Sequence, residues 1–130
     1  MQDTPTRYEM TFGTIECLEP GIVEVVVNGD VMMDGNMVNE CEGVLKTISG
    51  SEVGILVNKK NPYTHDEEAK HMLATLGMFK AMAVLLTGWF NSVPAKYLMS
   101  IPVDVTTPVQ LFHDRDEALS WLREQVAQPA

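Results

Sequence analysis

The sequence predicts a single α/β domain with a mostly parallel central sheet. Short apolar runs alternate with stretches whose apolar residues recur every three or four positions, the spacing of a helix with one covered face. Such an alternation requires crossover connections, which place successive strands parallel to one another. The run VGILV at 53–57 is continuously apolar, as expected of a strand covered on both faces. A length of 130 residues fits one domain, spanning 1–130.

An antiparallel hairpin is expected at the start of this sheet. Residues 8–18 alternate loosely and are rich in Thr, Phe and Ile, which is typical of a half-buried strand. Glu19-Pro20-Gly21 predicts a tight type II turn, since Pro fixes φ at the first corner and Gly permits a positive φ at the second. The β-branched run IVEVVVN at 22–28 predicts the second strand of the hairpin.

The first helix is expected after Asp30. Apolar residues from Met33 to Ile48 recur at spacings of three and four and form one stripe. Asp30 is a suitable N-cap, because its carboxylate can accept hydrogen bonds from the free amides of the first turn. Gly50 is a suitable residue for the left-handed conformation that ends many helices.

The strand at 53–57 leads into a polar loop and then into a second helix. The loop comprises residues 58–63, with the sequence NKKNPY. The segment that follows, THDE, matches a capping box, in which the Thr64 hydroxyl binds an amide of the first turn and the Glu67 side chain reaches back. We expect this second helix to stop at Gly77.

The C-terminal half continues the alternation. Residues 80–87 predict a strand, and residues 88–100 predict a third helix, with Pro94 tolerable only in its first turn. Residues 109–113 predict the last strand, and Asp114 opens the last helix. The inward-facing residues of that helix are expected to be Ala118, Leu119, Leu122 and Val126. The complete predicted order is β-β-α-β-α-β-α-β-α.

Charge and hydropathy exclude several functional classes. Nine Lys and Arg stand against eighteen Asp and Glu, and a net charge of −9 argues against a protein that tracks nucleic-acid phosphates. The longest apolar run, at 81–86, is far short of the ~20 residues that cross a bilayer. The N-terminus lacks the basic and apolar segments of a secretory signal. We therefore expect a cytoplasmic protein without an integral membrane segment.

Residues that commonly carry chemistry are few. Cys17 and Cys41 have no partners at metal-site spacing and are expected to be reduced thiols, with a disulfide between them as the alternative. His65 and His71 are six residues apart, which places them on opposing sides of a helix and not on one metal-binding face. The sequence contains no phosphate loop, dinucleotide fingerprint or nucleophile elbow. We expect no metal, no cofactor and no catalytic set.

Three features resemble the STAS domain family, which takes its name from sulfate transporters and anti-sigma-factor antagonists, and in particular its stand-alone bacterial STAS-like (CRAL-TRIO-like) members. They are the element order, the segment VGILVNKKNPYTHDEEA, and the C-terminal segment PVQLFHDRDEALSWLREQ with its Glu-Ala-x-x-Trp-Leu ending. The resemblance implies a regulatory, non-enzymatic STAS-like domain. Anti-sigma antagonists of that family are switched by phosphorylation of a serine at the start of the second helix. Here Thr64 is the hydroxyl at that place, and a capping role accounts for it, with phosphorylation of Thr64 as the alternative.

The loop after the strand at 53–57 is the first candidate binding site. Ligands of open parallel sheets collect beyond the carboxyl ends of the strands, near helix N-termini. Lys59 and Lys60 lie there together in an acidic protein, and an anion, an acidic partner or an anionic lipid head could bind them. A solvated turn is the alternative. His65, close to these lysines, is the best acid/base candidate in the sequence, with a solvated histidine as the alternative.

The predicted third helix is the second candidate surface. Trp89 and Phe90 are adjacent, so both cannot point inward from one helix. An exposed aromatic near Tyr97 and several methionines would mark a groove for a partner, a second copy or a lipid, whereas packing in the core is the alternative.

We therefore expect a non-enzymatic binding module for a protein partner or a small apolar or anionic ligand, possibly a homodimer in which this surface takes part. The alternatives are a small enzyme that uses His65 with Lys59 or Lys60, and a homo-oligomeric structural protein. The expected binding residues are Asn58, Lys59, Lys60, Tyr63, Thr64, His65, Trp89, Phe90 and Tyr97.

Overall fold

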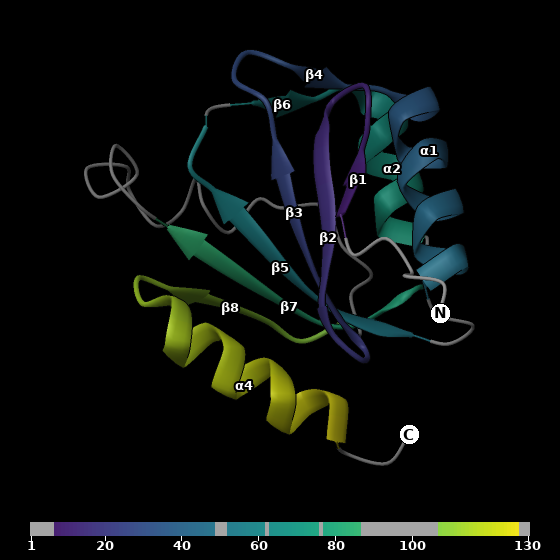
Figure 1. Cartoon of the computed structure of the whole chain (residues 1–130). Helices are drawn as coiled ribbons and strands as arrows, with labels where there is room; N and C mark the ends of the chain where they lie inside the picture. The colour runs from purple at the N-terminus through teal and green to yellow at the C-terminus, as the bar shows by residue number, and fades with distance from the viewer. Residues whose placement is uncertain (1–6, 49–51, 62, 76, 87–106, 128–130) are drawn as a thin grey trace.

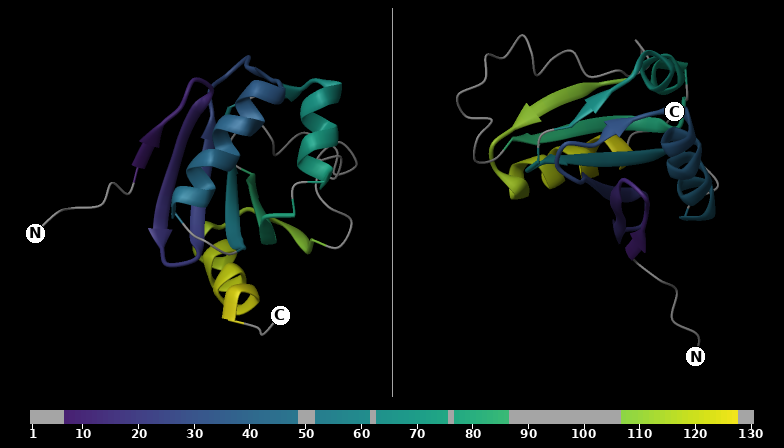
Figure 2. Two further views of the ribbon diagram at one scale, coloured as in Figure 1. Left: turned by 90° about the vertical axis from the view of Figure 1, so that its right-hand side faces the viewer. Right: turned by 90° about the horizontal axis from the view of Figure 1, so that it is seen from above.

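Helices cover both faces of a central sheet in the computed structural model, which describes residues 7–48, 52–61, 63–75, 77–86 and 107–127. The helices are α1 (Gly35–Ile48), α2 (Glu67–Thr75) and α4 (Arg115–Ala127). The strands of the main sheet are β1 (Arg7–Glu9), β2 (Gly13–Glu19), β3 (Ile22–Val27), β5 (Val53–Lys59), β7 (Phe79–Leu86) and β8 (Val109–Phe112). Helices α1 and α2 lie on one face of the sheet and α4 lies on the other (Figure 1, Figure 2).

The main sheet is mixed. Its six strands are ordered β1-β2-β3-β5-β7-β8. The pairs β1–β2 and β2–β3 are antiparallel, and the pairs β3–β5, β5–β7 and β7–β8 are parallel. The predicted α/β class, with a mostly parallel sheet and an N-terminal hairpin, is confirmed. The predicted third helix at 88–100, with Trp89, Phe90 and Tyr97, lies outside the described residues.

The N-terminal segment differs from the single strand predicted at 8–18. It forms two antiparallel strands, β1 and β2, joined by a tight turn in which the amide of Met10 donates to the carbonyl of Gly13 at 2.8 Å. Gly13 is needed because a Cβ atom at this position would collide with the carbonyl oxygen of Val26 on β3. The turn between β2 and β3 agrees with the prediction, since Gly21 has a φ of 84°.

A short parallel pair, β4 (Met32–Met33) with β6 (Thr64–His65), was absent from the prediction. The predictions of both helix caps are wrong, because these short strands occupy the segments just before the two helices. Asp34 caps α1 by accepting a hydrogen bond from the amide of Met37 at 2.9 Å, and Asp66 caps α2 by accepting one from the amide of Ala69 at 2.8 Å. Asp30 lies in a turn with a φ of 65°, and Thr64 belongs to β6. Each short strand therefore ends at the cap of the helix that follows it.

Side-chain alternation divides the apolar residues into two cores. Val23, Val25 and Val27 of β3 face α1 and α2, whereas Ile22 of the same strand faces α4. On the α4 face, the helix approaches the sheet closely at Gly54, where a Cβ atom would lie 2.8 Å from Cγ2 of Val126.

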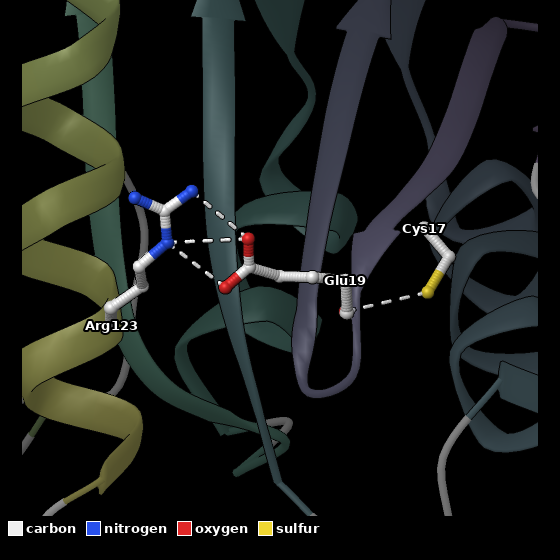
Figure 3. Close-up of polar contacts among 3 residues, drawn as sticks. All are labelled: Cys17, Glu19 and Arg123. Carbon is white, nitrogen blue, oxygen red and sulfur yellow. Dashed lines mark hydrogen bonds and ion pairs between the residues drawn. The ribbon is translucent and has the colours of Figure 1, made fainter.

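An ion pair also links α4 to the end of β2. Arg123 of α4 donates hydrogen bonds of 3.0 Å, 3.2 Å and 3.0 Å to the carboxylate of Glu19 (Figure 3). Next to it, the Cys17 thiol donates to the carbonyl of Glu19 at 3.6 Å, where the β2–β3 register shifts. The described cysteines, Cys17 and Cys41, are both free thiols, as predicted.

Candidate functional site

An apolar cavity lies between the sheet and the helices α1 and α2. Its volume is about 60 Å³. The lining residues described by the structure are Phe12, Val25, Val27, Met33, Cys41, Ile55, Val57, Tyr63, His65, Leu73, Phe79 and Met82. Only Tyr63 and His65 of this set carry side chains that readily form hydrogen bonds. The cavity is therefore suited to an apolar group, with polar partners restricted to one end.

The floor of the cavity follows from strand geometry. Side chains of a strand alternate between the two faces, so Val25 and Val27 of β3 and Ile55 and Val57 of β5 project toward the same helices. Parallel pairing sets Val25 beside Val57 and brings Met82 of β7 beside Ile55. The sequence order of these strands thus builds one apolar surface from three segments.

Lys59 continues this row at the end of β5. It is two residues after Val57, hence on the same face, and it is 8% exposed. Its Nζ atom lies 3.9 Å from the centroid of the Tyr63 ring, which lines the cavity. Within the part of the chain that the structure describes, no carboxylate comes within 4.0 Å of this nitrogen. Burial without such a partner lowers the pKa of Lys59 to about 8.

His65 and Tyr63 form the polar end of the cavity. Their rings meet edge to face, with centroids 5.3 Å apart and planes at 68°. The pKa of His65 falls to about 4, because burial and the charges of Lys59 and Lys70 outweigh the opposing charge of Asp66. Burial also raises the pKa of Tyr63 above its ordinary value. Both rings are therefore neutral at pH 7.

The short sheet β4–β6 holds His65 in this place. His65 is the register partner of Met33, another residue that lines the cavity. The amide of Thr64 donates to the carbonyl of Val31 at 3.0 Å, and the amide of Asp66 donates to the carbonyl of Met33 at 2.9 Å. The backbone is thus fixed on both sides of the imidazole.

The binding residues predicted in the loop after β5 lie in different places in the structure. Tyr63 and His65 line the cavity and Lys59 lies against the Tyr63 ring, whereas Lys60 and Thr64 are exposed. Asn58 faces α4, where its amide group donates to the Glu24 carboxylate at 2.9 Å. Trp89, Phe90 and Tyr97 lie outside the described residues.

The apolar wall of the cavity was not singled out from the sequence. Cys41 of α1 and Leu73 of α2 belong to ordinary helical stripes, and such stripes indicate a buried face without distinguishing a packed core from a cavity wall. Burial raises the pKa of the Cys41 thiol to about 12, so this sulfur is not an active nucleophile. Among the described residues, no three His, Cys, Asp or Glu side chains gather in a set that could hold a metal ion.

A second polar cluster lies on the α4 face. The Glu24 carboxylate accepts hydrogen bonds of 2.8 Å and 2.7 Å from the Arg115 guanidinium in addition to the one from Asn58. Burial alone would raise the pKa of Glu24, but the hydrogen bonds from Arg115 and Asn58, together with the charges of Arg115 and Lys60, hold it below its ordinary value. Each Glu24 oxygen has a strong partner, so this cluster fastens α4 to β3 and β5.

Comparison with known proteins identifies the family. A search of curated proteins found no match to this sequence. None of the helices in the described ranges is long and apolar enough to cross a membrane. A family model described as "Domain of unknown function (DUF7793)" matches residues 17–126, which include every described cavity-lining residue except Phe12. Because this match covers most of the chain, the protein belongs to the DUF7793 family.

Proposed function

We propose that the domain is a non-enzymatic module that binds a small apolar ligand with an anionic head group. The observation that carries this proposal is Lys59, a buried cation without a carboxylate partner among the described residues, whose Nζ atom lies over the ring of Tyr63 at the polar end of an apolar cavity. Removing an ammonium group from water is costly unless an opposite charge compensates. A ligand carboxylate would supply that charge, while the apolar part of the ligand would fill the cavity.

The volume of the cavity limits the size of the ligand. A cavity of about 60 Å³ exceeds several-fold the ~10–15 Å³ that one water molecule requires. This space suits a body of a few carbon atoms. We therefore propose a short or branched-chain carboxylate, with isovalerate as a suitable probe, because its branched alkyl group matches a wall of Val, Ile, Leu and Met side chains.

The electrostatics of His65 favour binding over acid–base catalysis. An efficient general base has a pKa near the working pH, whereas burial places the pKa of His65 at about 4. A neutral imidazole beside Tyr63 is suited to hydrogen bonding with a ligand. The resemblance to STAS domains supports a regulatory role, in which an occupied cavity would fix the position of α1 and α2 on the sheet.

Titration of the folded chain with isovalerate, followed by methyl NMR, tests the proposal. We expect shift changes at the methyl groups of Val25, Val57 and Met82, which line the cavity. Isopentanol has the same branched body without the charge and should bind at least tenfold more weakly. Lys59→Met should reduce isovalerate affinity to the level of isopentanol.

Lys60→Met is the matched control, because it removes an adjacent but exposed ammonium group. It should leave the isovalerate affinity within twofold of the original value. The proposal is wrong if isovalerate leaves the cavity methyl signals unchanged, or if Lys60→Met weakens binding as much as Lys59→Met does.

A further inference from the structure

We propose that Lys59 is also a covalent capture site, at which the amine condenses reversibly with the carbonyl carbon of a small apolar aldehyde. This inference rests on the proposed function, because the aldehyde would occupy the same cavity. It adds a second ligand class and a chemical step that simple anion binding does not involve.

The surroundings of Lys59 differ from those of the exposed Lys46 and Lys70. Lys46 pairs with Glu42 at 3.4 Å, and Lys70 pairs with Glu67 at 3.3 Å, each on the surface of its own helix. Lys59 is 8% exposed and lies over the face of the Tyr63 ring, without a carboxylate partner in the described part of the chain.

Desolvation makes an amine of this kind nucleophilic. Only the neutral amine can attack a carbonyl, and burial in an apolar site is the means by which imine-forming lysines obtain it at neutral pH. The pKa of Lys59, lowered to about 8, leaves roughly a tenth of this amine neutral at pH 7. The corresponding fraction for a lysine of ordinary pKa is about 300-fold smaller.

Imine formation needs only the neutral Lys59 amine and the aldehyde, and it releases one water molecule. The Lys59 nitrogen bonds to the carbonyl carbon and forms a carbinolamine. The carbon–oxygen bond then breaks, and the oxygen leaves as water with the two hydrogens that the neutral nitrogen carried. The product is an imine, and water returns it to the amine and the aldehyde. The apolar wall formed by Val57, Met82 and their neighbours would hold the alkyl group and limit the access of that water.

Reductive trapping on the full chain tests the inference. The protein is incubated at pH 7 with isovaleraldehyde and sodium cyanoborohydride, which reduces the imine to a stable secondary amine. Adducts are then located by peptide mass spectrometry. Among the described lysines, we expect Lys59 to be alkylated at least tenfold faster than Lys60, Lys46 and Lys70.

Two variants provide controls. Lys59→Arg retains a cation but cannot form an imine, and it should abolish the fast phase of lysine alkylation. Lys60→Arg should leave that phase unchanged. Peptide mapping of adducts on the protein without substitutions tests the inference even if Lys59→Arg fails to fold. The inference is overturned if the lysines react in order of their exposure, or if folded Lys59→Arg retains the fast phase.

The outcomes separate this inference from the proposed function. Isovalerate binding with no preference for alkylation at Lys59 would leave the anion site standing and remove the covalent step. Fast alkylation at Lys59 in a protein that does not bind isovalerate would support the reactive amine and remove the anion site. Protection of Lys59 by isovalerate would support both.

Discussion

The carboxylate of Glu24 on β3 is held by both terminal nitrogens of Arg115, the first residue of α4, at distances of 2.8 Å and 2.7 Å. The two residues are 91 positions apart in the chain. The Glu24 side chain is 9% exposed, whereas that of Arg115 is 42% exposed. Replacement of the partly exposed Arg115 would therefore leave the buried Glu24 carboxylate without its main partner.

Arg115→Met should destabilise the protein by leaving Glu24 buried without its main partner. We expect the free energy of unfolding at pH 7, measured by urea denaturation, to fall by about 2–4 kcal/mol. The double variant Glu24→Gln with Arg115→Met should recover part of this loss, because it removes the uncompensated charge. An unchanged unfolding midpoint in Arg115→Met would contradict the role assigned to the pair.

The same ion pair predicts an acid-dependent loss of stability. The pKa of Glu24 in the folded state is lowered from its ordinary value of 4.5. Its contribution is therefore fully present above pH 4.5 and is lost as the pH falls through the lowered folded value. The difference in unfolding free energy between the original protein and Arg115→Met should shrink as the pH falls below 4.5. A difference that is constant from pH 7 to pH 3 would rule this out.

Lys59→Met should stabilise the protein at pH 7 by about 1–3 kcal/mol, because it removes a desolvated charge and retains an apolar chain of similar length. The pKa of Lys59 is lowered to about 8 in the folded state, below its ordinary value of 10.5. Its cost is therefore full below pH 8 and disappears as the pH rises through 10.5. Thermal melts at pH 7 and pH 10 should show this narrowing gap, whereas Lys60→Met should change little at either pH.

His65 should titrate with a pKa of about 4 when its ring protons are followed by NMR. Since the folded state favours the neutral imidazole, the contribution of His65 to stability is present above pH 6.5 and is lost as the pH falls toward 4. His65→Gln should reduce this acid sensitivity between pH 6.5 and pH 4. His71→Gln, at an exposed position of α2, serves as the control. A measured pKa near 6.5 for His65 would contradict the burial assigned to it.

Val57→Ile should fill part of the cavity. The added methyl group faces α1 and α2, and we expect a gain in stability of about 0.5–1 kcal/mol together with a tenfold or greater loss of isovalerate affinity. Val26 alternates with Val25 and Val27, so Val26→Ile adds the same group to the opposite face of β3, away from the cavity, and should leave affinity unchanged. Equal effects of the two substitutions on affinity would show that the ligand does not occupy this cavity.

The helix caps provide a separate test of the fold. Asp66→Ala should lower the unfolding free energy by about 1 kcal/mol, because the amide of Ala69 would lose its partner. Thr64→Ala should have a much smaller effect, since Thr64 is an exposed residue of β6 and does not cap α2. A larger loss of stability in Thr64→Ala than in Asp66→Ala would instead support the capping box that the sequence alone predicts.

The elements that are determined by local patterns could be predicted from the sequence. Both the run at 53–57 and the turn at Gly21 have short-range sequence signals. The first signal is continuous apolarity, and the second is a glycine after proline, which adopts the expected positive φ. The break between β1 and β2 has no comparable signal, because it depends on the contact of Gly13 with Val26 in a neighbouring strand. The pair β4–β6 was missed for a similar reason, since each of its strands has two residues and the partners are 32 positions apart in the chain.

The candidate site was only partly predictable. Lys59, Tyr63 and His65 were identified because a cationic loop after a parallel strand is a common ligand site. The separation of Asn58 from Lys59 depends on how far β5 extends, and the sequence suggested that the strand ended at Val57. Its extension to Lys59 turns two loop residues into strand residues with opposite orientations. The partners of Glu24 likewise depend on contacts that span most of the chain.

The last two residues of β5 give this strand little tolerance for insertions and deletions. Asn58 binds Glu24 on the α4 face of the sheet, and Lys59 lies against Tyr63 on the other face. Removal of one residue from the middle of β5 would exchange their orientations, so that an ammonium group would meet Arg115 and an amide would face Tyr63. Length changes in family members should therefore fall in the connections around β5 and not within it, and engineered variants should keep its residue count fixed.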